Sequence, residues 1–350
     1  PARYAPLCEA QSFPKWKVRG KRNTHSATNF LGLMRRSEGL ARAEEGSGEE
    51  SARASAFLFL AGRAWEKIRI FAIIVSMETN ILKAFNNMSK LKSFQLAELY
   101  SGQNRMNNVG TALEYFVRDI FCSSIDVVGL ENKDKKHSEH LSYLGNQNNP
   151  PDFIVKNGDA IEVKKIGGLV GSIALNSSYP KSKLHSDDVR ILQSCRECDG
   201  GNWSKKDIVY AVGSVVESKI KTLWFVYGDC YAADREVYEK TFKSISKKVH
   251  EIDHLEFTAE TNEIAGVYLR VRGMWGIDTP HKVFGSLTEF SRESDFSAFT
   301  LMLDEKYKSF PKEDREEIES NSSIKIKTVE IKSPNNPANY LKAKLICFVK

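Results

Sequence analysis

The sequence lacks any long uninterrupted run of apolar residues. Its most apolar stretch, 56–75, is interrupted by four charged side chains and is therefore a poor membrane span. The chain also lacks a GxxxxGKS/T phosphate-binding loop, which disfavours an ATP-driven translocase. Hydrophobic residues make up 41% and charged residues 27% of the chain, and this balance is typical of a soluble globular protein.

Cysteine is scarce, with six residues scattered through 350 and no recognisable secretory signal. We therefore expect reduced thiols and a location in the bacterial cytoplasm. Cys195 and Cys198 form a lone CxxC, because no second ligand pair follows at the spacing typical of zinc sites. The sequence gives no support for a zinc centre or for thioredoxin-like redox chemistry.

Aspartate is absent from the first 80 residues, and their composition differs from that of the remaining chain. They hold 13 Lys and Arg against 8 Glu, a net charge of +5, whereas residues 81–350 hold 38 basic and 37 acidic residues, a net charge of +1. A nucleic-acid function for 81–350 must therefore rest on local clusters. We expect 1–76 to be an N-terminal extension of separate origin and 77–350 to form the functional domain.

Apolar periodicity in 77–350 predicts a mixed α/β fold, with a central mixed β-sheet flanked by helices. Helices are expected at 108–122 and 235–249 and over most of 286–322, and a loop is expected at 131–151. Strands are expected on either side of Asn157–Gly158, and at 124–130, 207–216, 222–227, 264–277, 324–332 and 341–349.

The segment from Pro151 to Lys164 contains the pattern that indicates chemistry. It reads PDFIVKNGDAIEVK and has the form PD…ExK, with Asp152, Glu162 and Lys164 as its polar members. Metal-dependent cleavage of a phosphodiester needs two carboxylates that converge on a divalent cation and a cationic group near the attacking water. Short patterns of this kind also arise by chance, so an amphipathic hairpin with a solvated charged face is the alternative interpretation.

Asp207, Glu217 and Lys219 have the same spacing and form a rival site. The intervening residues, IVYAVGSVV, are mainly apolar and hold no firm turn signal, so we expect a single strand. At about 3.3 Å per residue, such a strand separates the two carboxylates by about 30 Å, too far to share a metal ion. In the first segment, by contrast, Asn157–Gly158 folds the chain back between the carboxylates.

The loop length of this hairpin decides which side chains share a face. A two-residue Asn-Gly turn would place Glu162 on the same face as Phe153. We expect a three-residue loop, 157–159, which pairs Asp152 with Lys164 and gathers the three polar members of the pattern on one face. On the other face would lie Lys165 and the apolar side chains of Phe153, Val155, Ile161 and Val163.

The PD…ExK segment resembles the active site of the PD-(D/E)xK nuclease superfamily, and 108–122 lies where that fold has its first core helix. Four further stretches resemble type II restriction endonucleases: LNSSYPKSKL (175–184), KDIVYAVG (206–213), LWFVYGDCYAADREVY (223–238) and YLRVRGMWGIDTP (268–280). Over essentially all of 77–350, the chain is similar to the NgoPII-like group, which cuts the palindrome GGCC. The resemblance implies a restriction-endonuclease-like core and Mg²⁺-dependent double-strand cleavage that leaves 5′-phosphate ends.

The resemblance also assigns roles to individual residues. Asp152 and Glu162 would bind Mg²⁺, with the backbone carbonyl of Val163 as a further ligand. Lys164 would orient or activate the attacking water and offset the charge that grows on the phosphate. Glu114, on the first core helix, would reach the metal through a water molecule, and an ordinary helix-surface carboxylate is the alternative for this residue.

Candidate DNA contacts lie on two segments. Arg270 and Arg272 alternate on one face of a predicted strand, and paired hydrogen bonds from Arg to guanine are the commonest specific base contact. The other segment combines neutral donors with cations, a mixture suited to phosphates and a groove edge. Its members are Asn176, Ser177, Ser178, Lys181 and Lys183. A solvated strand face and an exposed loop are the respective alternatives.

These observations predict a type II restriction endonuclease that acts on double-stranded DNA. Because a palindromic site has two-fold symmetry, we expect a homodimer with one active site for each strand. The resemblance also implies a separate methyltransferase that protects host DNA at the same site. Two alternatives stay open: a repair or recombination nuclease that reads DNA structure, and a non-catalytic DNA-binding module that retains only the hairpin.

Overall fold

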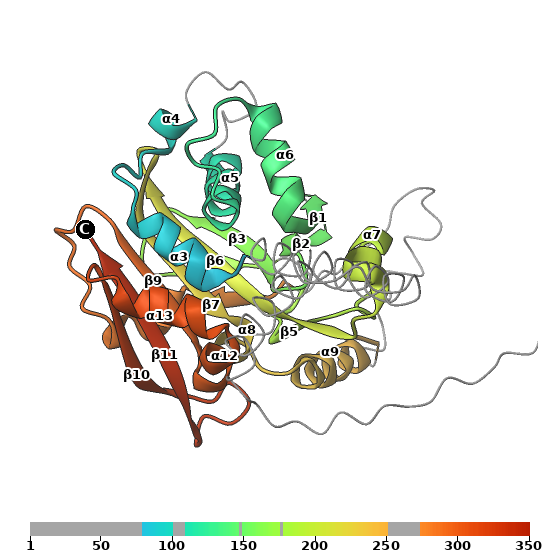
Figure 1. Ribbon diagram of the computed structural model, residues 1–350. Coiled ribbons are helices and arrows are strands. Elements are labelled where there is room, and N and C mark those ends of the chain that lie inside the picture. The colour runs from blue at the N-terminus through green and yellow to red at the C-terminus, as the bar shows by residue number, and fades with distance from the viewer. Residues whose placement is uncertain (1–78, 101–108, 147–148, 176–177, 251–273) are drawn as a thin grey trace, which may run out of the picture. The chain divides into compact units, whose positions relative to one another are not determined.

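A mixed β-sheet lies at the centre of the computed structural model, which describes residues 79–100, 109–146, 149–175, 178–250 and 274–350 (Figure 1). Across the described sheet, the strands follow the order β1 (Leu141–Asn146), β2 (Asn149–Val155), β3 (Ala160–Ile166), β6 (Lys205–Val216), β7 (Lys219–Tyr227), β9 (Ser297–Leu303), β11 (Tyr340–Val349) and β10 (Ile324–Lys332). The β3–β6 and β7–β9 pairs are parallel, and their neighbours in this order are antiparallel. The predicted mixed sheet is confirmed.

Two short pairings add to this sheet. β5 (Lys183–His185) runs antiparallel to the start of β6. β4 (Ser172–Ala174) and β8 (Gly276–Asp278) form a separate antiparallel pair, which brings the chain after β3 next to a segment about a hundred residues later.

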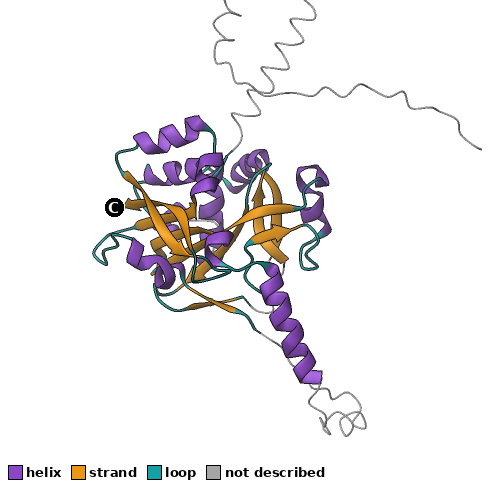
Figure 2. Ribbon diagram, turned by 90° about the horizontal axis from the view of Figure 1, so that it is seen from below, coloured by secondary structure: helices purple, strands orange, loops and turns teal. Residues whose placement is uncertain are grey.

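Helices cover both faces of the sheet (Figures 1 and 2). α5 (Val109–Cys122) packs against β3 and β6, and α8 (Gly228–Tyr231) packs against β6, β7 and β9. The other helices of the described residues are α3 (Ile81–Ser89), α4 (Leu96–Leu99), α6 (Leu130–His140), α7 (Gln193–Glu197), α9 (Arg235–His250), α11 (Pro280–Phe284), α12 (Asp304–Ser309) and α13 (Lys312–Ser320), with 3-10 turns η2 (Cys198–Gly201) and η3 (Gly285–Leu287). None of the helices that the structure describes is long and apolar enough to cross a membrane.

The surroundings of β6 explain why the sequence of this central strand is a continuous apolar run. Gly213 lies against Leu113 of α5, whereas Ile208 lies against Gly228 of α8. Residues of odd and even number point to opposite faces of a strand, so both faces of β6 are covered and both need apolar side chains. The strand is continuous from 205 to 216 and separates the carboxylates of the rival site, as predicted.

Two predictions between α5 and β2 are wrong. Residues 124–129 form turns and irregular chain rather than a strand, and α6 begins at Leu130. The described residues of 131–151 form the rest of α6, β1 and the start of β2 rather than a loop. α6 is held by a buried polar network, because Lys133 Nζ donates to Asp119 Oδ2 at 2.5 Å and His137 Nε2 lies 2.7 Å from Asp119 Oδ1. A helix that packs through buried charges has no apolar stripe, so apolar periodicity could not reveal it.

The prediction of a mainly helical 286–322 is wrong in its centre. Residues 297–303 form β9, a fully enclosed strand between β7 and β11, and only 304–320 are mainly helical. A short apolar run that is buried on every side cannot be assigned to helix or strand by periodicity alone. The strand expected at 264–277 lies mostly outside the described residues, which show β8 at its end.

Candidate active site

The β2–β3 hairpin carries the PD…ExK pattern. Phe153 pairs with Ile161 across the hairpin, and the amide of Val155 donates to the carbonyl of Asp159 at 3.0 Å. The loop therefore has three residues, 156–158, so the predicted length is right but the loop begins one residue earlier. This change moves the register by two residues, and each side chain keeps its predicted face because strand side chains alternate with a period of two.

The position of Asp159 explains the earlier loop. Its carboxylate is buried, with Oδ2 accepting from the hydroxyl of Tyr227 at 2.5 Å and Oδ1 accepting from Lys306 Nζ at 2.7 Å. These partners hold Asp159 at the end of the sheet rather than in the loop. The turn is made instead around Asn157, whose φ is 55°, a left-handed conformation that Asn tolerates better than most residues.

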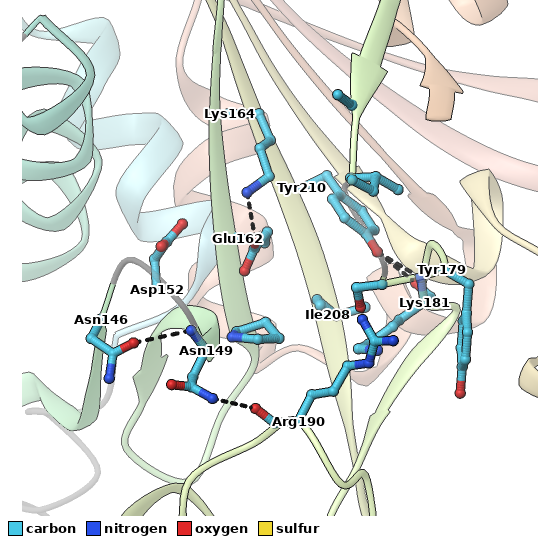
Figure 3. Close-up of a pocket in the computed structure, with 14 residues that line it drawn as sticks. Asn146, Asn149, Asp152, Glu162, Lys164, Tyr179, Lys181, Arg190, Ile208 and Tyr210 are labelled. Atoms are coloured by element: carbon cyan, nitrogen blue, oxygen red, sulfur yellow. Dashed lines mark hydrogen bonds and ion pairs between the residues drawn. The ribbon is translucent and has the colours of Figure 1, made fainter. Parts of the chain in front are cut away.

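In this register Asp152 lies opposite Glu162 instead of Lys164. Asp152 Oδ2 accepts a 2.6 Å hydrogen bond from the amide of Val163, and Lys164 Nζ donates to Glu162 Oε1 at 2.6 Å. The other oxygen of Glu162, Oε2, is buried and has no partner among the described residues. The neighbouring Lys165 is exposed. The structure thus brings the three polar members of the pattern together on one face (Figure 3).

Burial and repulsion perturb the ionisation of this cluster. Burial raises the pKa of Asp152 to about 7, and the nearby charge of Glu162 adds to the shift. Burial lowers the pKa of the Lys164 ammonium, but neighbouring carboxylates, with Glu162 the strongest, outweigh it and raise the pKa above its ordinary value. A buried carboxylate such as Asp152, whose proton affinity is raised by burial and by a neighbouring carboxylate, favours the binding of a cation.

Glu114 lies within electrostatic range of the cluster. Burial raises the pKa of Glu114, and the charges of Lys164 and Glu162 act on it from the hairpin. Its carboxylate also lies 3.3 Å from Nη2 of Arg118, one turn further along α5. The helix expected at 108–122 is therefore confirmed as α5, and it brings Glu114 near the polar face of the hairpin.

The donor set fits a divalent cation such as Mg²⁺. In the described residues no group of three or more His, Cys, Asp and Glu side chains could hold a metal ion. Mg²⁺ does not require such a group, because one or two carboxylates usually suffice when water and substrate phosphate complete its shell. The unpartnered Oε2 of Glu162, buried beside Asp152, is the kind of oxygen that such an ion would satisfy.

A pocket of about 370 Å³ opens over the cluster. Figure 3 shows Asp152 and Glu162 on one side and Arg190, Lys181 and Tyr179 on the other. Its walls come from β1, β2, β3 and β6 and from residues at 174–175, 178–181 and 190. The lining residues are Asn146, Asn149, Pro150, Asp152, Glu162, Lys164, Ala174, Leu175, Ser178, Tyr179, Lys181, Arg190, Ile208 and Tyr210.

Comparison with known proteins assigns the chain to a protein family. A model of the family described as NgoPII restriction endonuclease matches residues 79–332. The chain belongs to the NgoPII restriction endonuclease family. The type II restriction enzyme NgoPII of Neisseria gonorrhoeae is 39% identical over 279 residues, which cover 77% of this chain and 99% of that enzyme. No solved structure matches the chain.

The candidate DNA contacts of this NgoPII family member have different surroundings. Ser178 lines the pocket. Lys181 lines it too, but its Nζ lies 2.7 Å from Asp188 Oδ2. Lys183 forms ion pairs with Asp207 and Asp229. The two lysine charges are thus paired within the protein, and their contact with DNA stays a prediction. Asn176, Ser177, Arg270 and Arg272 lie outside the described residues.

Sequence reasoning missed several pocket residues of this NgoPII family member. Asn149, Tyr179, Arg190 and Tyr210 line the pocket with the carboxylates. Tyr179 and Tyr210 lie in two of the stretches that resemble type II restriction endonucleases, but the resemblance assigns them no role, and Asn149 and Arg190 lie in none of these stretches. Asn149 could have been noticed, because it stands three positions before Asp152 and shares its strand. Arg190 is separated from the hairpin by two short strands, β4 and β5, and no local pattern predicts its return to the site.

Proposed function

We propose that the chain is a site-specific deoxyribonuclease that cuts both strands of a short palindromic DNA site, GGCC, in a Mg²⁺-dependent reaction leaving 5′-phosphate ends. Membership of the NgoPII restriction endonuclease family is the observation that carries this proposal. The convergence of Asp152, Glu162 and Lys164 at one pocket supports it, because this chemistry needs two carboxylates and a cation at the scissile phosphate.

The proposed roles follow from the contacts. Asp152 and Glu162 would hold the metal, with the Val163 carbonyl as a further ligand, and the ion would supply Lewis-acid stabilisation of the phosphate. The Val163 amide fixes the Asp152 carboxylate at 2.6 Å, which limits its rotation. Lys164 would orient the attacking water and stabilise the charge developing on the phosphate. Glu114 would hold a water molecule at the metal from α5.

Two-fold symmetric DNA favours a homodimer with one active site on each strand. Host DNA would be protected by a separate methyltransferase acting on the same site. The DNA contacts would include Ser178, Lys181 and Lys183 beside the pocket, together with Asn176, Ser177, Arg270 and Arg272. The five cysteines of the described residues are free and buried thiols, which suits the reducing cytoplasm of a bacterial cell.

We also propose that 77–350 is the catalytic domain and 1–76 an extension outside it. The family match lies entirely within the proposed domain, at 79–332. The described residues belong to one compact unit, Ile73–Lys350. These two observations support a boundary close to residue 76.

The proposal is tested by digesting unmethylated plasmid with the purified protein, with and without Mg²⁺. We expect discrete fragments whose ends map to GGCC, and no fragments with Asp152→Ala or Lys164→Ala. Lys165→Ala is the matched control, because this exposed lysine adjoins Lys164 but does not line the pocket. Nicked circles or a smear would indicate a structure-reading nuclease. DNA binding without cleavage at any Mg²⁺ concentration would indicate a non-catalytic module.

A further inference from the structure

Arg190 is a pocket residue that the roles above do not use. It is half-buried and lines the same pocket as Asp152 and Glu162. Its main chain is hydrogen bonded, but its guanidinium makes no hydrogen bond, ion pair or aromatic contact with another described residue. Figure 3 shows the guanidinium extending into the pocket from the wall opposite the carboxylates.

The other cations that line the pocket are already paired. Lys164 Nζ donates to Glu162 at 2.6 Å, and Lys181 Nζ lies 2.7 Å from Asp188. Burial alone raises the pKa of Asp188, but its ion pair with Lys181 and, more weakly, the charge of Arg190 outweigh burial and lower it. Asp188 makes its direct ion pair with Lys181. Among the described cations lining the pocket, Arg190 is therefore the one without a direct ion pair, and its five donors point to an anion that is not part of this chain.

The backbone that carries Arg190 is fixed on both sides. The amide of Arg190 donates to Asp188 Oδ1 at 2.9 Å, and its carbonyl accepts from Asn149 Nδ2 at 2.8 Å. The next residue, Ile191, is buried at 3% exposure. The loop itself is tied down by Arg196, which donates to the carbonyls of Ser186 and Asp188. The main chain that carries the guanidinium is thus already ordered, so little main-chain entropy is lost when an anion binds.

We infer that Arg190 binds a phosphate group of the DNA backbone at or next to the scissile bond, with two guanidinium N–H groups donating to its two non-bridging oxygens. The planar fork of Arg matches such a pair of acceptors. A guanine edge offers a similar pair, but a pocket that holds the carboxylates of Asp152 and Glu162 receives the backbone that is to be cut. This inference rests on the proposed function, because it takes the pocket as the cleavage site.

The first test is DNA binding without metal, which separates Arg190 from catalysis. Wild type, Arg190→Gln and Arg190→Lys are titrated with a duplex carrying one GGCC site and with a scrambled duplex, over a range of salt concentrations. Arg235→Gln is the matched control, because Arg235 pairs with Asp187 on the same loop but does not line the pocket. Melting temperatures of all variants show whether each is folded.

For a phosphate contact we expect Arg190→Gln to bind both duplexes about 10- to 100-fold more weakly, as for the loss of a hydrogen bond to a charged group. The slope of the logarithm of the binding constant against the logarithm of the salt concentration should become shallower by about 1 for this variant. Arg190→Lys should recover part of the loss, because it keeps the charge without the fork. The inference would be overturned if folded Arg190→Gln bound the duplexes with the same dissociation constants as wild type or Arg235→Gln.

The second test identifies the acceptor. Single methylphosphonate substitutions remove the charge from one phosphate at a time, and 7-deazaguanine removes the guanine N7 acceptor. We expect one methylphosphonate position, at or beside the cut, at which wild type and Arg190→Gln bind equally. If only 7-deazaguanine makes the two proteins equal, Arg190 reads a base and the phosphate assignment is wrong.

Cleavage of unmodified plasmid by wild type, run in parallel, keeps the two proposals apart. If wild type cuts at GGCC and the Arg190 variants bind normally, the inference alone fails. If wild type binds but never cuts, the proposed function fails, and the methylphosphonate scan still reports whether Arg190 contacts a phosphate. In either case, the inference is overturned if the scan finds no methylphosphonate position at which wild type and Arg190→Gln bind with equal affinity.

Discussion

The side-chain amide of Asn149 donates a 2.8 Å hydrogen bond to the main-chain carbonyl of Arg190, 41 residues further along the chain. Asn149 lies on β2, three positions before Asp152. This bond joins the loop that carries the unpaired guanidinium to the strand that carries a carboxylate of the candidate site. The two walls of the pocket are therefore held at a fixed separation by a residue that carries no charge.

Asn149→Ala should weaken metal-free binding of the GGCC duplex by up to about 10-fold, because a hydrogen bond of this kind stabilises by about 0.5–1.5 kcal/mol. The same substitution should have no further effect in the Arg190→Gln background, since Asn149 acts through Arg190. A double-mutant cycle on the dissociation constant measures this coupling. The control is Asn132→Ala, which removes a 2.9 Å side-chain bond to a carbonyl outside the pocket. Fully additive effects would contradict the positioning role.

Glu162→Gln should separate DNA binding from cleavage. The substitution removes a buried negative charge beside Asp152, so metal-free DNA binding should tighten as repulsion of the phosphates falls. Cleavage should fall by about 100-fold or more, because metal-ion catalysis supplies several kcal/mol. Filter binding and plasmid digestion on the same preparation check both effects. Glu330→Gln, an exposed position on β10, should change neither, and weaker binding by Glu162→Gln would refute the electrostatic argument.

Asp119→Asn should lower the free energy of unfolding by about 3–5 kcal/mol, the usual loss when one partner of a buried ion pair is removed. Lys133 would be left buried without its 2.5 Å partner. Thermal and denaturant unfolding measure the loss, and Asp126→Asn is the control because Asp126 is exposed nearby. A loss below about 1 kcal/mol would mean that the network contributes little to stability.

The same network predicts a pH dependence. Burial by itself raises the pKa of Asp119, but hydrogen bonds from His137, Lys133 and Ser124 outweigh it and hold the pKa below its ordinary value of 3.8. The stabilisation by ionised Asp119 is thus fully present above pH 3.8 and is lost as the pH falls through the lower folded-state pKa. The stability difference between wild type and Asp119→Asn should accordingly shrink only below about pH 4, as pH-resolved unfolding would show.

Gly228→Ala should destabilise the fold by about 1–3 kcal/mol or more, as expected for overpacking. A Cβ at Gly228 would lie 2.4 Å from the carbonyl oxygen of Lys181 and 2.6 Å from that of Ser182, and main-chain atoms cannot easily move aside. Gly168→Ala is the control, because nothing lies within 4 Å of a Cβ built there. Equal melting temperatures for the two variants would contradict the close approach of α8 to the 181–182 segment.

Removal of 1–76 should leave cleavage at GGCC within about twofold of the full chain, because the family match lies outside this segment. Digestion of plasmid by both proteins at equal concentration, with circular dichroism as the folding check, tests this boundary. A folded truncation that has lost cleavage would show that 1–76 contributes to the activity.

The sequence was informative where local pattern and burial agree. Helical apolar spacing correctly predicted α5, and runs rich in Val, Ile and aromatic residues correctly predicted β6 and β7. Face segregation correctly placed Asp152, Glu162 and Lys164 together. The register was missed by two residues, because the position of Asp159 is set by Tyr227 and Lys306 from distant strands and helices. No local signal reports such long-range partners.

Elements held by polar contacts or enclosed on all sides escaped prediction. α6 is held in place by the buried contacts of Lys133 and His137 with Asp119. In the sequence, polar residues at these positions are typical of a solvated loop. β9 is apolar on both faces, so its run resembles a buried helix. Arg190 is placed at the pocket by tertiary contacts alone. A single Arg in a polar stretch of sequence gives no indication of which site its side chain will line.

β3 is bonded to neighbours on both sides, to β2 through Phe153–Ile161 and to β6 along its whole length from 160 to 166. The β2 ladder covers only the start of β3, at 160 and 161, whereas the β6 ladder covers the whole strand. Amide hydrogens of β3 that are bonded in these ladders should exchange with solvent only when the sheet opens. The ladder to β6 thus restrains the strand that carries Glu162 and Lys164 from shifting to follow a substrate. Mutual adjustment between protein and DNA must come from side chains or from bending of the duplex itself.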